Sequence, residues 1–154
     1  IYPMSATCFR REYMAFFRRN PFIHVSTYGG AEVGCPVAAV VLDESSSPEF
    51  LAHVNELARL FRDGFTGLLK KHPRILVGLR QLGLMMGIEM IKDDCGPLMT
   101  KACYERGILA FYANNDQRVC QLLPPLIIDK RVAAEIIGGI DLALTDTADF
   151  LGLK

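Results

Sequence analysis

The 154-residue sequence has no tryptophan, only three histidines and no uncharged apolar run near the roughly 20 residues of a membrane-spanning helix. The first residues, IYPMSATCFRREY, also lack the pattern of a signal peptide. We therefore expect a cytoplasmic chain with no membrane partner. Neither sign of charge dominates, because 17 Lys and Arg residues balance 17 Asp and Glu residues. This balance gives no field that would attract nucleic acid, so a small-molecule ligand is expected.

Cysteine and histidine are too few and too scattered to predict a metal site. The five cysteines form no CxxC pair, and no histidine lies near one of them at the spacing of zinc ligands. No histidine is paired with a serine or cysteine in a way that indicates a catalytic nucleophile. We therefore expect neither a metal nor a catalytic triad, and we expect buried free thiols. The cysteines are Cys8, Cys35, Cys95, Cys103 and Cys120, and the histidines are His24, His53 and His72.

Two helices are predicted in the first half of the chain. Small apolar residues follow Gly34, and Pro36 places the start of the first helix near that glycine, because an interior proline removes a hydrogen bond. Ser47 and Pro48 then supply the N-cap and the first position of a second helix. Its apolar side chains recur every three or four residues up to about Lys71, as in an amphipathic helix. These side chains are Phe50, Val54, Leu57, Phe61, Phe65 and Leu68.

The second half of the chain alternates between strand-like and helix-like patterns. Glycines and prolines mark most of the boundaries. The order of elements predicts an α/β fold of the α+β kind, with a small, mostly antiparallel sheet and helices packed on one face. The predicted elements are a hairpin of Ile75–Leu79 and Leu84–Ile91, a helix from Gly96 to Gly107, strands at Ile108–Tyr112 and Val119–Leu123, and a helix capped by Asp129 that runs to about Thr147.

The stretch HVSTYGG (24–30) places two hydroxyl side chains before a glycine pair and a helix. Hydroxyls and glycine amides in such a place can form an anion cradle, although a plain turn leading into a helix uses the same residues. Three more motifs follow in order: GLMMGIEM (83–90), RGIL (106–109) and QLLPPLIID (121–129). Together the four motifs resemble the C-terminal part of the class III, fold-type I pyridoxal-phosphate aminotransferases. That group includes ornithine, acetylornithine and 4-aminobutyrate aminotransferases.

The resemblance implies an enzyme that uses pyridoxal 5'-phosphate to move an amino group from an amine or amino acid donor to a 2-oxo acid. It implies a homodimer with the cofactor site at the subunit interface. Residues 45–154 would form the C-terminal small domain of this fold. Residues 1–44 would be a remnant of the large cofactor-binding domain and the interdomain helix.

The resemblance also places the catalytic lysine outside this chain. In the family, the segment similar to YPMSA lies just after the lysine that binds the cofactor covalently, so we expect that lysine upstream of Ile1. The chain would then be a C-terminal fragment that has no catalytic residue and is inactive alone. None of its lysines has the sequence context of the family's lysine; they are Lys70, Lys71, Lys92, Lys101, Lys130 and Lys154.

The resemblance assigns Thr27 to the cofactor phosphate of the neighbouring subunit, with Ser26 shaping the same loop. Before the Pro-Pro pair, many members carry an arginine that grips the substrate carboxylate, and this chain has Gln121 there. Glutamine donates a hydrogen bond but cannot form the charged two-pronged pair. Gln121 is therefore either a substrate-binding residue or a plain edge-strand residue. Arg118 is either its substitute or an exposed arginine beside a turn.

Two other functions remain open. A mutase or decarboxylase of the same fold would use the same cofactor and the same small domain. Alternatively, the chain is a non-catalytic dimerisation or interaction module, since its hydrophobic content of 51% leaves apolar surface for a partner. Glu89, inside an apolar strand, is either a functional acid or a residue of the strand's solvent face.

Overall fold

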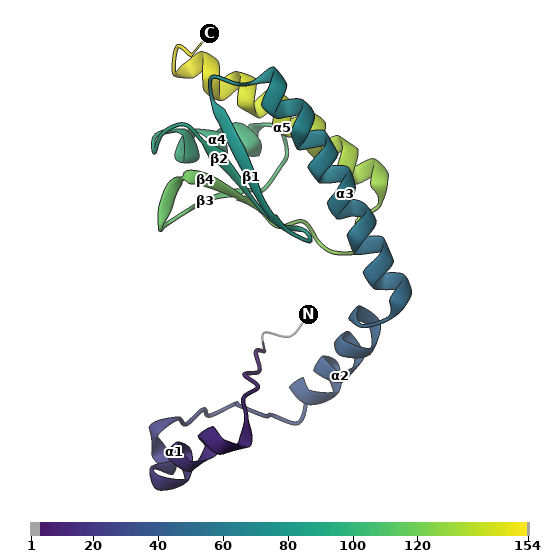
Figure 1. Cartoon of the computed structure of the whole chain (residues 1–154), viewed down its shortest axis with the longest axis vertical. Helices are drawn as coiled ribbons and strands as arrows, with labels where there is room; N and C mark the ends of the chain where they lie inside the picture. Colours follow the sequence, from purple (N-terminus) through teal and green to yellow (C-terminus); the bar gives the residue numbers. More distant parts are fainter. Residues whose placement is uncertain (1–3, 154) are drawn as a thin grey trace. The chain divides into compact units, whose positions relative to one another are not determined.

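The structure is a computed structural model that describes residues 4–153 of the chain. The chain divides into two compact units, Ile1–Phe50 and Leu51–Lys154, each with its own architecture. Figure 1 shows their elements in chain order, from purple to yellow. Within residues 4–153, no helix is both long and apolar enough to cross a membrane.

The first unit consists of short helical segments and one longer helix. The segments are η1 (Arg11–Tyr13), α1 (Met14–Arg19) and η2 (Pro21–Ile23), and the longer helix is α2 (Gly34–Ser45). The predicted start of α2 at Gly34 is confirmed, with Pro36 in its first turn. Among the described residues of this unit, Gly34 alone is buried. The expectation of buried thiols is therefore wrong for Cys8 and Cys35, which are exposed because this unit offers them no core to enter.

Three helices, α3 (Pro48–Lys71), α4 (Cys95–Glu105) and α5 (Lys130–Phe150), begin close to the predicted positions. The Ser47 hydroxyl accepts a hydrogen bond from the backbone N–H of Phe50 at 3.2 Å, which is the predicted N-cap of α3. The Asp129 carboxylate accepts one from the N–H of Val132 at 2.8 Å and caps α5 in the same way. Local sequence therefore sets the start of both long helices.

The second unit contains a four-stranded sheet in the order β1-β2-β4-β3. Its strands are β1 (Leu76–Leu82), β2 (Met85–Met90), β3 (Phe111–Ala113) and β4 (Asp116–Leu122), and every neighbouring pair is antiparallel. The predicted hairpin is confirmed: β1 and β2 turn at Gly83, whose φ of 59° suits glycine. Figure 1 shows α4 and α5 on one side of the sheet, with α3 running beside α5. This arrangement confirms the predicted fold class.

The core lies between the sheet and these helices. Helix α3 contributes the aromatic side chains Phe61 and Phe65, and each has no exposed surface. The three remaining cysteines are buried free thiols, as predicted. Further fully buried core residues are Leu57, Ile88, Met90, Cys95, Met99, Cys103, Cys120, Ile140 and Leu144.

The two predicted strands that surround the Asn114-Asn115 turn have different bounds in the structure. We predicted a strand from Ile108, but the N–H of Ile108 donates to the carbonyl of Cys103 at 2.9 Å and that of Gly107 donates to Tyr104 at 3.0 Å. These two bonds form a Schellman motif, so the residues that open the predicted strand still terminate α4. Strand β3 therefore starts only at Phe111.

Strand β4 begins three residues before the predicted Val119. Asp116 already pairs with Ala113 across the turn, so the hairpin closes over two residues. The polar residues at the start of β4 hide this pairing in the sequence, because aspartate, glutamine and arginine are uncommon in strands or neutral toward them. This early start places the Asp116 side chain on the sheet.

Candidate functional site

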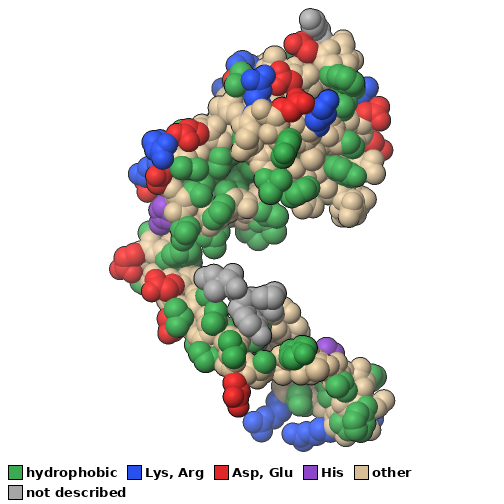
Figure 2. Space-filling model, turned by 180° about the vertical axis from the view of Figure 1, so that it is seen from behind, with side chains coloured by type: hydrophobic (Ala, Val, Ile, Leu, Met, Phe, Trp, Pro, Cys, Tyr) green, Lys and Arg blue, Asp and Glu red, His purple; other side chains and the backbone are tan. Residues whose placement is uncertain are grey.

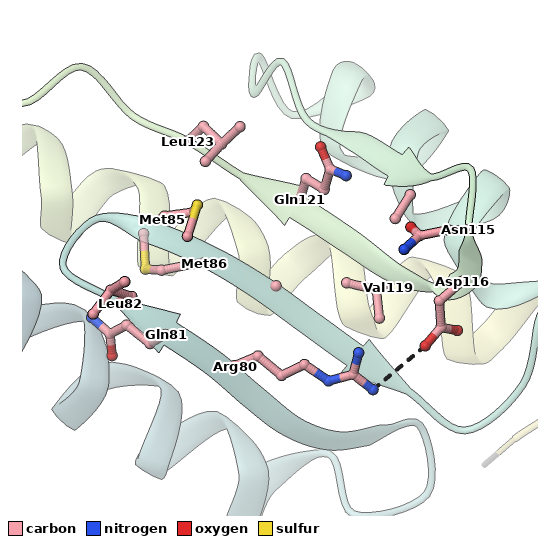
Figure 3. A pocket seen from close by; sticks show the side chains of 12 residues that line it. Arg80, Gln81, Leu82, Met85, Met86, Asn115, Asp116, Val119, Gln121 and Leu123 are labelled. Atoms are coloured by element: carbon pink, nitrogen blue, oxygen red, sulfur yellow. Dashed lines mark hydrogen bonds and ion pairs between the residues drawn. The ribbon is translucent and has the colours of Figure 1, made fainter. Parts of the chain in front are cut away.

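The face of the sheet that α4 and α5 do not cover carries a hollow of about 600 Å³. This volume lies within the range of small-molecule sites. Figure 3 shows its side chains, which come from the β1–β2 hairpin and from β4 with the turn before it. Its lining residues are Arg80, Gln81, Leu82, Met85, Met86, Gly87, Ala113, Asn115, Asp116, Val119, Gln121 and Leu123.

Strand alternation explains which side chains reach this hollow. In β2, Met86, Ile88 and Met90 are buried under the helices, so Gly87 and Glu89 belong to the opposite face. Gly87 pairs with Arg80 on one side and with Gln121 on the other. A Cβ atom at Gly87 would lie 2.9 Å from Cγ1 of Val119, so the glycine leaves the floor of the hollow open.

A group of ion pairs, here called the Arg80 cluster, borders the hollow; it consists of Arg80, Glu89, Asp116 and Arg118. Nη2 of Arg80 lies 2.5 Å from Oε1 of Glu89, and its Nε lies 3.2 Å from Oε2, so the pair is bidentate. Arg80 also reaches Oδ2 of Asp116 at 3.4 Å, drawn as the dashed line in Figure 3. The guanidinium of Arg118 holds both oxygens of Asp116, at 3.0 and 3.1 Å.

The ion pairs of the Arg80 cluster shift the pKa values of Arg80, Asp116 and Arg118 in the direction that favours their charged forms. The hydrogen bond and charge of Glu89 raise the pKa of Arg80 above its usual value. Hydrogen bonds from the side chain and backbone of Arg118 lower the pKa of Asp116, although desolvation opposes them. Asp116 in turn raises the pKa of Arg118. Two cations and two anions therefore face each other at the edge of the hollow, and their charges cancel.

The second candidate feature is the loop that contains Ser26 and Thr27, in the first unit. It borders a separate hollow of about 480 Å³ lined by Ser26, Tyr28, the glycine pair, Cys35 and the chain near Ser5. A Cβ atom at Gly29 would lie 2.8 Å from that of Ser26, and Gly30 has a φ of 72°. Both positions therefore require glycine for this loop shape.

The loop offers hydrogen-bond donors to an anion. Thr27 is exposed, and within residues 4–153 its hydroxyl has no hydrogen-bond partner. The N–H of Ala31 donates to the carbonyl of Tyr28 at 3.1 Å, which closes the turn just before α2. No Asp or Glu is among the described residues that line this hollow, and hydroxyl groups and glycine amides suit a phosphate, so the residues present fit the phosphate of pyridoxal phosphate.

The structure places the four predicted site residues in different surroundings. Ser26 and Thr27 share the loop of the first unit, and Gln121 lines the hollow of the second. Arg118 does not line that hollow in the described structure, because its guanidinium is bound to Asp116. To bind a substrate carboxylate, the guanidinium of Arg118 would first have to release the carboxylate of Asp116.

Sequence reasoning missed the roles of Arg80 and Asp116. Arg80 was not singled out, and Asp116 lay outside the predicted strands, which ended at Tyr112 and began again at Val119. The turn at Gly83 held a usable signal, because the hairpin register that it sets brings Arg80 and Glu89 to one face. Glu89 lies on the face of β2 that the helices do not cover, as strand alternation predicts, and its side chain is part of the Arg80 cluster.

Neither hollow has a lysine among its described lining residues. Lys71, Lys101 and Lys130 instead form surface ion pairs, with Asp141, Glu105 and Glu56 respectively. Within residues 4–153, no group of three or more His, Cys, Asp or Glu side chains could hold a metal ion. The chemistry of both features is therefore that of hydroxyls, amides and paired charges.

Known proteins resemble this chain along nearly its whole length. The model of the family described as aminotransferase class III matches residues 2–144. An uncharacterized aminotransferase of Archaeoglobus fulgidus is 43% identical over 147 residues, which are 93% of this chain and 34% of that protein. An acetylornithine aminotransferase of Caldanaerobacter subterraneus is 30% identical over 145 residues, or 94% of this chain and 35% of the relative. The chain thus spans about a third of the length of these relatives.

Solved structures of aminotransferases also resemble this chain. The N-acetylornithine aminotransferase of Stenotrophomonas maltophilia superposes with a TM-score of 0.67 at 27% identity, over 82% of this chain and 34% of that one. An omega transaminase of Pseudomonas jessenii reaches a TM-score of 0.76 over 92% of this chain and 33% of its own, at 20% identity, and so supports the fold. The family match includes both the Ser26-Thr27 loop and the strands of the hollow. The chain belongs to the class III aminotransferase family.

Proposed function

We propose that this chain is the C-terminal part of a pyridoxal-phosphate-dependent aminotransferase that moves an amino group from an amine or amino acid to a 2-oxo acid. The observation that carries the proposal is the class III match over residues 2–144, which includes both the hydroxyl-glycine loop and the hollow. Because the chain spans about a third of its relatives, the lysine that holds the cofactor is proposed to lie in the rest of the full-length protein.

In this proposal, Thr27 binds the phosphate group in the site of the neighbouring subunit of a homodimer. Its free hydroxyl donates a hydrogen bond to a phosphate oxygen, and Ser26 with the glycine pair holds the loop in shape. Pyridoxal phosphate, when bound, supplies the electron sink that lets the carbon bearing the amino group give up a proton. The protein's contribution from this loop is orientation, because a phosphate held at one end fixes where the cofactor ring lies.

The hollow of the second unit is proposed to form one wall of the substrate pocket. Its apolar side chains exclude water from the substrate, and the Gln121 amide donates or accepts one hydrogen bond. A pocket of this kind orients an amine without taking part in proton transfer. The three buried thiols agree with a reducing compartment, and we retain the cytoplasm as the proposed location.

The proposed role of Thr27 is tested by the matched pair Thr27→Val and Thr27→Ser in the full-length protein. Valine keeps the shape and removes the hydroxyl, so the affinity for pyridoxal phosphate should fall about tenfold, whereas serine should keep most of it. The affinity is measured by absorbance titration of the apoprotein. Equal affinity for both variants and the parent would remove Thr27 from the phosphate site.

The isolated 154-residue chain tests the position of the lysine. Incubation with pyridoxal phosphate, borohydride reduction and mass spectrometry should find no lysine labelled stoichiometrically. A full-length protein treated in the same way should carry one label outside these residues. One specific label within residues 1–154 would show that the chain holds the cofactor itself. Transfer of the amino group to an added 2-oxo acid separates a transaminase from a mutase or decarboxylase.

A further inference from the structure

The hollow on the open face of the sheet has few charged groups of its own. Among its described lining residues, Arg80 is the basic one and Asp116 the acidic one. Most of the others are apolar, and Met85, Leu82 and Leu123 are strongly exposed to solvent there. The charge that a ligand meets in the hollow therefore depends on what holds Arg80.

Arg80 is already neutralised in this structure. Glu89 binds two of its guanidinium nitrogens, at 2.5 and 3.2 Å, and Asp116 lies 3.4 Å from one of them. Arg118 adds a positive charge, but that charge is bound to Asp116 at 3.0 Å and lies 4.0 Å from a further acid, Asp93. The four residues of the Arg80 cluster sum to zero charge. A carboxylate entering the hollow would meet no unpaired cation among the described residues.

Gln121 lies across the sheet from Arg80. Both residues pair with Gly87, one from β1 and the other from β4, so the open position at Gly87 separates them. Figure 3 shows Gln121 on the β4 side of the hollow and Arg80 on the β1 side. Apart from Arg80 and Asp116, the polar side chains that line the hollow, Gln81, Asn115 and Gln121, are neutral amides.

We propose that this hollow binds the uncharged, largely apolar part of an amine substrate and disfavours a carboxylate, because Glu89 and Asp116 hold Arg80 while Gln121 offers a neutral hydrogen bond. This proposal rests on the proposed function, since it names the substrate class for the same pocket wall. Glu89 and Asp116 are then specificity-determining residues that act through Arg80. Any carboxylate of the donor or of the 2-oxo acid is bound outside this hollow.

Binding to the 154-residue chain tests the selectivity without any cofactor. Hexanamide and hexanoate have the same length and differ only in the head group, where a neutral amide replaces a charged carboxylate. Each is titrated while the methyl group of Met85, in the hollow, is followed by carbon-13 NMR. The methyl group of Met90, which is fully buried, serves as the internal control. Hexanamide should shift the Met85 signal with an affinity roughly two- to fivefold higher than that of hexanoate, the effect of one exposed charge interaction.

Removing either carboxylate should leave the Arg80 cluster with one positive charge that no carboxylate of the cluster balances. Asp116→Asn and Glu89→Gln should each raise the affinity for hexanoate by roughly two- to fivefold and leave that for hexanamide unchanged. Gln121→Arg should raise it about tenfold, because it adds an arginine that no described carboxylate holds. The matched control is Asp146→Asn, since Asp146 pairs with Arg106 outside the hollow and should change neither affinity.

The outcomes separate this proposal from the proposed function. Tighter binding of hexanoate by the unmodified chain, or failure of both ligands to shift Met85, would overturn the selectivity proposal even if the full-length protein transaminates. Unchanged hexanoate affinity in both carboxylate variants would do the same. A full-length protein that transfers no amino group while its hollow prefers hexanamide would refute the aminotransferase proposal alone. Circular dichroism of each variant confirms that it is folded.

Discussion

Replacement of Gly96 by alanine tests how the hairpin that carries Asp116 and Gln121 is held. Gly96 lies in the first turn of α4, where a Cβ atom would lie 2.0 Å from the carbonyl oxygen of Gln117 in β4. It would also lie 2.9 Å from Cβ of Tyr112 in β3. Helix α4 thus packs directly on the backbone of the β3–β4 hairpin, and the glycine makes this approach possible.

The magnitude follows from these distances. Relief of the contact requires the carbonyl to retreat by about 1.4 Å, from 2.0 Å to the 3.4 Å of an ordinary contact. Overpacking of this kind costs about 3 kcal/mol, since backbone rather than a flexible side chain must move. Alanine recovers at most about 1 kcal/mol through its higher helix propensity. Gly96→Ala should therefore lower the free energy of unfolding by about 2 kcal/mol.

The assay is urea unfolding of the 154-residue chain under reducing conditions, followed by far-UV circular dichroism. Gly67→Ala is the matched control, because Gly67 lies within α3 and a Cβ atom there would meet nothing within 4 Å. That change should raise the free energy of unfolding by about 0.5 to 1 kcal/mol. If Gly96→Ala were as stable as Gly67→Ala, the close approach of α4 to β4 would not exist in solution.

Two further predictions concern helix ends. Asp129→Ala removes the carboxylate that accepts from the N–H of Val132 at 2.8 Å, and should cost about 1 kcal/mol in urea unfolding, whereas Asp129→Ser should recover most of it. Asp141 is joined to His72 and Lys71 at the end of α3, and these hydrogen bonds lower its pKa although burial opposes them. A carboxyl group whose pKa is lower in the folded state than in the unfolded state stabilises the fold at pH values above its unfolded pKa, which is near 4. This stabilisation is lost as the pH falls through the folded-state pKa. The free energy of unfolding of Asp141→Asn should therefore change less with pH below about pH 4 than that of the parent. The same pH dependence in both proteins would show that Asp141 does not contribute to it.

Much of the fold was predictable because its signals are local. Ser47, Pro48 and Asp129 specify helix starts through hydrogen bonds to residues three positions away, and Gly83 specifies a hairpin through its own dihedral angles. The strand bounds near Gly107 were less accurate. There a Schellman motif, which depends on two backbone hydrogen bonds, uses residues whose composition is typical of a strand.

The candidate site was only partly predictable. Thr27 and Gln121 were assigned by resemblance, since a hydroxyl or an amide by itself indicates no ligand. The ion pair between Arg80 and Asp116 joins residues 36 positions apart, and it exists only because β2 pairs with both β1 and β4. The sequence pattern of a single strand does not indicate which strands lie next to each other. The ion pair could therefore be identified only from the structure, in which the two hairpins pair through β2 and β4.

The chemistry of the hollow is linked to the register of the whole sheet. Arg80, Gly87, Gln121 and Phe111 form one row across all four strands, because each pairs with the next. A slip of one residue in any pair would move a member of this row to the helix-covered face, where burial of an unpaired Arg80 or Gln121 is costly. The packing that stabilises the opposite face therefore also places a restrained cation, an open position and a neutral amide side by side. Selectivity in the hollow should for this reason change with single side chains, as in Asp116→Asn, while the row itself persists as long as the sheet is folded.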